Sequence, residues 1–163
     1  NIEAKGARLF FEKYKCNNCH SNSLFSDFDF HSIGIVSQKK DKSIDKGRFE
    51  VTGNAKDFLK FRTPSLRNVT LTAPYMHDGS IDSLEQAIYK HFNGCERESL
   101  HYKLCIGNAF KYTEMIQPNE ILEIIEFLKF LEDKSHSSED VIPLQVPSGL
   151  KIDALISTDA VDR

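Results

Sequence analysis

Apolar residues recur at helical spacing in the first part of the chain. Between Ile2 and Tyr14 they stand among Lys, Arg and Glu, and the spacing predicts a short amphipathic helix. Gly6 lies inside this segment, where glycine costs about 1 kcal/mol relative to alanine. We therefore expect Gly6 to mark a close approach to another helix.

A second helix is predicted after Ser83, because the Ser83-Leu84-Glu85-Gln86 segment forms a capping box. The residues that follow at i, i+3, i+4 and i+7 fall on one face of that helix: Leu84, Ala87, Ile88 and His91. His91 is thus expected on the buried stripe. The Asn93-Gly94 pair is expected to end the helix with a left-handed cap.

The third predicted helix runs from Pro118, a residue favoured at the first helical position, to about Asp133. Its apolar face consists of Ile121, Leu122, Ile124, Ile125, Leu128 and Leu131. We expect it to cross the N-terminal helix and form the core. The fold class is therefore mainly α with long irregular loops, with one domain over residues 1–134 and a C-terminal tail over 135–163.

The segment from Ser21 to Asp57 is predicted to be a loop, since its composition is polar and periodic hydrophobicity is weak. It nevertheless carries apolar residues at Leu24, Phe25, Phe28, Phe30, Ile33 and Ile35. Such a loop packs either on a flat apolar group or on a small cluster of its own. The sequence leaves both possibilities open.

Composition narrows the classes of protein. The chain has 163 residues, 40% hydrophobic content and a net charge of -3, so it is long enough for one core and is neither disordered nor basic. This balance argues against nucleic acid as a partner. No apolar run approaches the 18 residues or more that a membrane span requires, so we expect no membrane span.

The segment Cys16-Asn17-Asn18-Cys19-His20 is the attachment signature of a c-type haem. Each thiol can add to one haem vinyl group, and the imidazole of the next residue can take an axial position of the iron. A zinc site would need a second close pair of ligands at matching spacing. A thioredoxin-like pair would follow a strand, whereas the preceding segment here is predicted to be helical.

Cysteine usage indicates an oxidising, extracytoplasmic compartment such as the periplasm. Cys95 and Cys105 are expected to form a disulfide that pins a short loop, the alternative being two free thiols. No signal peptide is visible, and we expect one in a precursor.

An ordered series of segments gives the chain a family resemblance. It comprises the haem motif, Phe25-Ser26-Asp27, Phe30-His31, Gly47-Arg48-Phe49, Val51-Thr52-Gly53, Thr63 to Asn68, Thr72 to Gly79 and Ser83-Leu84-Glu85. The chain resembles the C-terminal, electron-transfer haem domain of bacterial di-haem cytochrome c peroxidases and MauG-like proteins. The resemblance covers roughly residues 4 to 133.

The resemblance implies a cytochrome c-like haem domain that receives electrons from a small donor protein, a cytochrome c or a cupredoxin. The electrons would pass to a second haem domain or chain, where peroxide is reduced. It also implies a calcium ion at the domain interface, with backbone carbonyls of Thr72 and Pro74 among its ligands. Only one haem motif is present, so one covalent haem is expected and the isolated chain is expected to be inactive as a peroxidase.

The sixth iron ligand has two candidates. Alignment through the Leu84 to Ala87 segment puts the family's ligand position at His91, which implies two axial histidines and a lower potential than His/Met. Met76 is the rival, because it lies in a loop as the ligand methionine of simple cytochromes c does. Met115 is a weaker candidate.

Three further residues are predicted to contact the haem: Phe25 and Phe30 through the apolar loop, and Arg67 through a propionate, since its planar fork matches a carboxylate. A surface role for Arg67 is the alternative. The sequence assigns no catalytic residue. A stand-alone haem module for binding or sensing, without turnover, stays open beside the electron-transfer domain.

Overall fold

The computed structural model describes residues 1–37, 43–93 and 114–133. The helices and strands below belong to the compact unit Asn1–Glu132, and the second unit, Asp133–Arg163, lies outside the described residues apart from Asp133. The predicted Cys95–Cys105 disulfide and the predicted tail over 135–163 also fall outside them. Both stay predictions.

The N-terminal helix is confirmed. Helix α1 spans Ile2–Arg8, and the side chain of its N-cap residue Asn1 accepts a hydrogen bond from the backbone amide of Ala4. A π-helical turn, η1 (Leu9–Lys13), continues it toward the haem motif.

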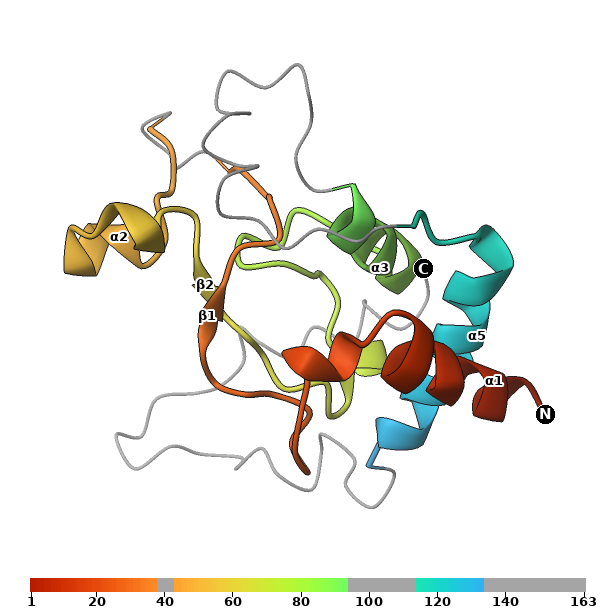
Figure 1. Cartoon of the computed structure of the whole chain (residues 1–163). Helices are drawn as coiled ribbons and strands as arrows, with labels where there is room; N and C mark the ends of the chain where they lie inside the picture. The colour runs from red at the N-terminus through yellow and green to blue at the C-terminus, as the bar shows by residue number, and fades with distance from the viewer. Residues whose placement is uncertain (38–42, 94–113, 134–163) are drawn as a thin grey trace, which may run out of the picture. The chain divides into compact units, whose positions relative to one another are not determined.

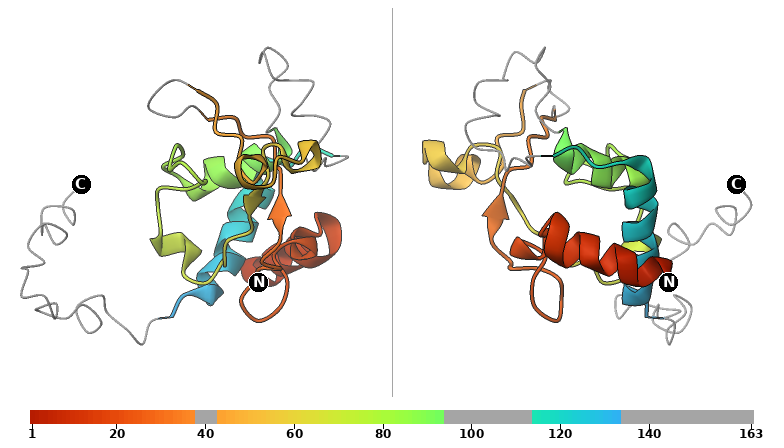
Figure 2. Two further views of the ribbon diagram at one scale, coloured as in Figure 1. Left: turned by 90° about the vertical axis from the view of Figure 1, so that its left-hand side faces the viewer. Right: turned by 45° about the vertical axis from the view of Figure 1, so that its right-hand side comes forward.

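The predicted C-terminal helix is confirmed as α5 (Pro118–Leu128), followed by a 3-10 turn, η5 (Lys129–Leu131). Helix α1 crosses α5 in both Figure 1 and Figure 2. A Cβ atom added at Gly6 would lie 1.8 Å from the carbonyl oxygen of Glu123. Gly6 is therefore the close packing point that the sequence predicted, because only a hydrogen fits between the two backbones.

The core of the described unit forms where α1, η1 and α5 meet. Its buried residues are Phe10, Tyr14, Val69, Ile116, Ile121, Ile124, Leu128 and Leu131. The predicted apolar face of α5 is correct except at Leu122, which is 50% exposed. Leu122 is therefore half covered, whereas Ile121 and Ile124 beside it are buried.

The second predicted helix is α3 (Leu84–Phe92), which lies near the N-terminal part of α5 (Figure 2). Its N-cap is the predicted one, since the Ser83 hydroxyl accepts a hydrogen bond from the amide of Gln86 at 3.2 Å. The predicted left-handed cap is not found at Asn93, whose φ is -129°. Gly94 lies outside the described residues.

The expected long loops contain short regular elements that the sequence did not reveal. They are η2 (Cys16–Asn18), β1 (Phe30–His31), α2 (Phe49–Thr52), η3 (Ala55–Asp57), β2 (Phe61–Arg62) and η4 (Val69–Leu71). Strands β1 and β2 pair antiparallel, with His31 opposite Phe61. Elements of two to four residues are too short to produce a hydrophobic period, so the pattern could not predict them. The mainly helical fold with long irregular segments is confirmed.

No described helix combines the length and the apolar character that crossing a membrane requires.

Candidate functional site

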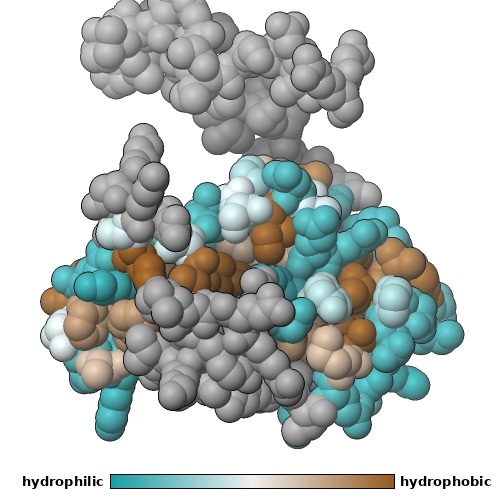
Figure 3. All heavy atoms as spheres, turned by 90° about the horizontal axis from the view of Figure 1, so that it is seen from above, coloured by the Kyte–Doolittle hydropathy of each residue, from teal (hydrophilic) through white to brown (hydrophobic). Residues whose placement is uncertain are grey.

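A cavity of about 440 Å³ lies beside the haem motif. The motif supplies Cys16, Cys19 and His20 to its lining, and the predicted stripe of α3 supplies Leu84, Ala87, Ile88 and His91. Apolar core residues and loop residues complete it, among them Phe10, Ile33, Ile35, Leu59, Leu66, Ile124 and Leu128. Hydrophobic residues also gather on the face of the described part shown in Figure 3. The cavity is thus a mostly apolar space with a few polar groups, as is usual for cofactor sites.

The haem motif reaches the cavity through a local turn. Lys15 adopts a left-handed conformation with φ of 49°, and the 3-10 turn Cys16–Asn18 follows directly. The amide of His20 donates to the carbonyl of Cys16 at 2.9 Å. This tight turn brings two thiols and one imidazole to the lining of the cavity.

His20 and His91 approach each other across this cavity, with ring centroids 6.4 Å apart. Nδ1 of His20 lies 3.1 Å from the carbonyl oxygen of Phe25, and Nδ1 of His91 lies 2.8 Å from that of Ala87. A carbonyl can only accept, so each Nδ1 carries the proton. Each Nε2 is then the unprotonated nitrogen that can bind a metal, the arrangement usual for histidine ligands.

The electrostatics of the pair favour the neutral form of both rings. Burial, together with the nearby His91, lowers the pKa of His20 to about 4. Burial also lowers the pKa of His91, which its bond to the Ala87 carbonyl only partly opposes. Both imidazoles are therefore neutral near pH 7, and the neutral ring is the one that ligates.

The separation of the two rings would suit a haem iron bound by both. An imidazole nitrogen lies about 2 Å from a bound transition metal and its ring centroid roughly 1.1 Å further out, so two opposite ligands have centroids roughly 6 Å apart. The observed 6.4 Å is close to this value. Cys16 and Cys19 lie on the same cavity, where thioether bonds would fix the ring edge.

The rival ligand and the predicted calcium residues also line the cavity. Met76, Thr72 and Pro74 all belong to its wall, in the segment between η4 and α3. Met76 adopts a left-handed conformation with φ of 73°. The hydroxyl of Thr72 donates to the carbonyl of Val69 at 3.2 Å. The calcium ion itself stays a prediction.

The other predicted haem contacts are not among the described residues that line the cavity: Phe25, Phe30 and Arg67. The Phe25 ring packs against Phe10 and Phe127, with centroids 6.0 and 6.3 Å apart. Arg67 donates to the carbonyl of Ser23 at 2.9 and 2.7 Å.

The apolar loop as a whole follows neither of the two arrangements that the sequence left open. Ile33 and Ile35 line the cavity, whereas the Phe25 ring joins an aromatic cluster of the core. The Phe30 ring lies under the guanidinium of Arg48, whose carbon is 4.2 Å from the ring centroid.

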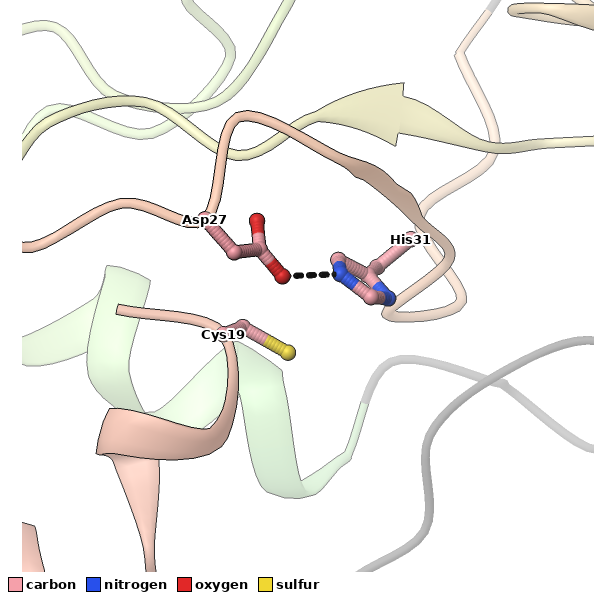
Figure 4. Close-up of side chains that lie close together, drawn as sticks. All are labelled: Cys19, Asp27 and His31. Atoms are coloured by element: carbon pink, nitrogen blue, oxygen red, sulfur yellow. Dashed lines mark hydrogen bonds and ion pairs between the residues drawn. The ribbon is translucent and has the colours of Figure 1, made fainter. Parts of the chain in front are cut away.

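The sequence analysis gave no role to Asp27 and His31, which lie close to Cys19 in the structure. One nitrogen of His31, one carboxylate oxygen of Asp27 and Sγ of Cys19 lie within 4.8 Å of one another. In Figure 4, Asp27 and His31 point toward each other, and Nε2 of His31 is 2.6 Å from Oδ2 of Asp27. One signal in the sequence could have pointed to them. Asp27 and His31 lie four residues apart, each in a segment that resembles the family.

Comparison with known proteins gives the family. No protein-family model matches the chain. The chain is 33% identical over 129 residues to the methylamine utilization protein MauG of Methylorubrum extorquens, an alignment that covers 78% of this chain and 34% of MauG. It is 32% identical over 136 residues to the cytochrome c551 peroxidase of Pseudomonas aeruginosa, covering 81% of this chain and 34% of the relative.

Solved structures of similar fold come from the same group of proteins. A MauG-like protein associated with microbial copper homeostasis superposes with a TM-score of 0.67 and 31% identity, over 83% of this chain and 48% of that one. The diheme peroxidase BthA of Burkholderia thailandensis also gives 0.67, at 20% identity, over 82% of this chain and 43% of that one. The fold is thus the cytochrome c-like fold of diheme peroxidases. The chain belongs to the di-haem cytochrome c peroxidase and MauG family and spans about a third of the curated relatives' length.

Proposed function

We propose that this chain is the electron-transfer haem domain of a di-haem peroxidase or MauG-like oxidoreductase. The observation that carries the proposal is the pair of facing histidines, His20 and His91, beside the two cysteines of the haem motif. A haem c bound there supplies a one-electron ferric/ferrous couple.

The chain's own residues each have a task in this proposal. Cys16 and Cys19 would hold a haem c through thioether bonds, and His20 and His91 would bind its iron. The carbonyls of Phe25 and Ala87 fix the orientation and tautomer of the two imidazoles. The geometry supports His91 over Met76 as the sixth ligand, because His91 already lies at ligand distance from His20.

An iron bound by both histidines would have no position left for peroxide, which favours electron transfer over peroxide reduction at this site. The lining is mostly apolar, and charges interact more strongly in such surroundings than in water. By this proposal peroxide reacts at a second haem domain, and a small cytochrome c or cupredoxin supplies electrons. We further propose an extracytoplasmic location and a calcium ion held by the carbonyls of Thr72 and Pro74.

The test is to produce the chain with a haem-attachment system and examine the purified protein. We expect its mass to exceed that of the peptide by one haem, and we expect the haem to stay with the protein in acid-acetone extraction. We also expect a low-spin spectrum that carbon monoxide does not change in the ferrous protein. Extractable haem would refute covalent attachment. A chain that binds carbon monoxide readily would instead be a binding or sensing module.

A further inference from the structure

The loop Ser21–Asp29 connects the haem motif to the small sheet. Ser21 follows His20 directly, and the chain returns to the motif six residues later, where the amide of Asp27 donates to the carbonyl of Cys19 at 2.8 Å. Between these points, Phe25 supplies the carbonyl 3.1 Å from Nδ1 of His20, a ring that also has a backbone hydrogen bond to Pro64. The position of this carbonyl therefore depends on what holds the loop.

Side chains at the end of the loop fasten it to the sheet. Oδ2 of Asp27 accepts a hydrogen bond from Nε2 of His31 on β1 at 2.6 Å, and Oδ1 accepts from the amide of Asp29 at 3.0 Å. The hydroxyl of Ser26, which is fully buried, donates to the carbonyl of Thr63 at 2.8 Å.

Phe25 needs this support, because its φ is 53°, in the left-handed region that a phenylalanine rarely adopts. Backbone held in such a conformation persists only where the surroundings determine it. The Asp27–His31 pair lies two residues beyond Phe25 and is partly buried, with 22% and 37% of the two side chains exposed.

Cys19, Asp27 and His31 together have the side-chain types of a metal site. The sulfur of Cys19, however, is committed to a thioether bond by the proposed function. The Asp27–His31 pair then needs a different explanation.

Resting on that proposed function, we infer that the Asp27–His31 pair is a positioning device for the axial ligand His20. It holds the loop so that the Phe25 carbonyl stays on Nδ1 of His20. A hydrogen bond from Nδ1–H to a carbonyl makes the imidazole a more basic ligand, which stabilises ferric iron and lowers the potential. Releasing the loop weakens this bond, so the potential rises and the Nδ1 proton of His20 exchanges faster with water.

The experiment compares two variants at one position in the haem-loaded chain. His31→Ala removes the bond to Asp27, whereas His31→Gln keeps an N–H donor near the place of Nε2. We expect His31→Ala to raise the midpoint potential and to speed exchange of the His20 ring proton, seen by proton NMR, by about tenfold, the factor for one hydrogen bond. His31→Gln should stay near the wild type in both measurements.

The alternative is that His31 affects the potential only through its charge. Both His31 variants remove the same ionisable group, so this alternative predicts an equal shift of the potential in the two variants. Asp29→Asn is the matched control, since Asp29 lies in the same loop and its side chain bonds the amide of Phe30, not His31. Because the carboxylate of Asp29 acts electrostatically on Cys19, we expect Asp29→Asn to raise the potential through the lost charge but to leave the exchange rate of the His20 ring proton unchanged. Equal shifts in the two His31 variants, or no change in the exchange rate of His31→Ala, would overturn the inference.

Different results would refute the proposed function and this inference. A wild-type chain without covalent haem would refute the function, whereas a normal haem with insensitive His31 variants would refute only the positioning role.

Discussion

Gly6→Ala is the substitution whose effect the structure predicts most directly. The added Cβ would lie 1.8 Å from the carbonyl oxygen and 2.6 Å from the carbonyl carbon of Glu123. Both atoms belong to the backbone of α5, so no side-chain rotation can relieve the overlap. Helices α1 and α5 must move apart or tilt.

The magnitude follows from two opposing effects. Overpacking a well-fitted core costs about 1–3 kcal/mol, and a backbone contact this short points to the upper end. Replacing glycine by alanine inside a helix regains about 1 kcal/mol. We therefore expect Gly6→Ala to lower the free energy of unfolding by about 2 kcal/mol, and Tm by roughly 5–10 °C.

The assay is denaturant unfolding of the haem-loaded protein, followed by far-ultraviolet circular dichroism. Gly53→Ala is the matched control, because a Cβ there meets nothing within 4 Å and only the left-handed φ of 65° is strained. That strain should cost about 1 kcal/mol. If Gly6→Ala proves no less stable than Gly53→Ala, the close contact between α1 and α5 does not limit stability and the reasoning is wrong.

Other predictions concern the haem ligand, turnover and pH. His91→Gly should convert a low-spin iron to a high-spin or water-ligated one, whereas Met76→Ala should leave the visible spectrum unchanged; the opposite pattern would make the loop methionine the ligand. The isolated chain should turn over peroxide slowly with a reduced donor cytochrome, and fast turnover would show an open iron. Hydrogen bonds from Lys13 and Tyr14 outweigh burial and hold the pKa of Glu120 below its ordinary 4.5. This stabilisation is present above pH 4.5 and is lost as the pH falls through the lowered pKa, so Glu120→Gln should cost roughly 1–2 kcal/mol at pH 7. Denaturant titrations at pH 7 and pH 3 would test this, since the variant should show a smaller loss between them.

Local features of the site could be predicted from the sequence. The haem motif consists of five consecutive residues, so it can be identified from residue types and spacing alone. The stripe from Leu84 to His91 follows from the helical period, and the close approach at Gly6 follows from a glycine that helix propensity disfavours. In each case the information lies within one or two helical turns.

The arrangement of distant segments was decided by the tertiary structure. Helical periodicity placed His91 on a buried face, but only the crossing of α3 and α5 decides that this face meets His20. The same is true of Leu122, which has the right spacing for the apolar face of α5 but stays 50% exposed.

Loop positions were the least accessible to sequence reasoning. Phe25 matters here through its carbonyl, and a carbonyl is present at every residue, so no residue type signals it. Arg67 has the chemistry of a propionate partner, and the sequence did not indicate that its guanidinium also bonds the Ser23 carbonyl. The contact between Asp27 and His31 joins a loop residue to a strand of two residues, which is too short for a hydrophobic period. Side-chain chemistry and local spacing are written in the sequence, but the distance between two groups on separate segments depends on how the whole chain packs.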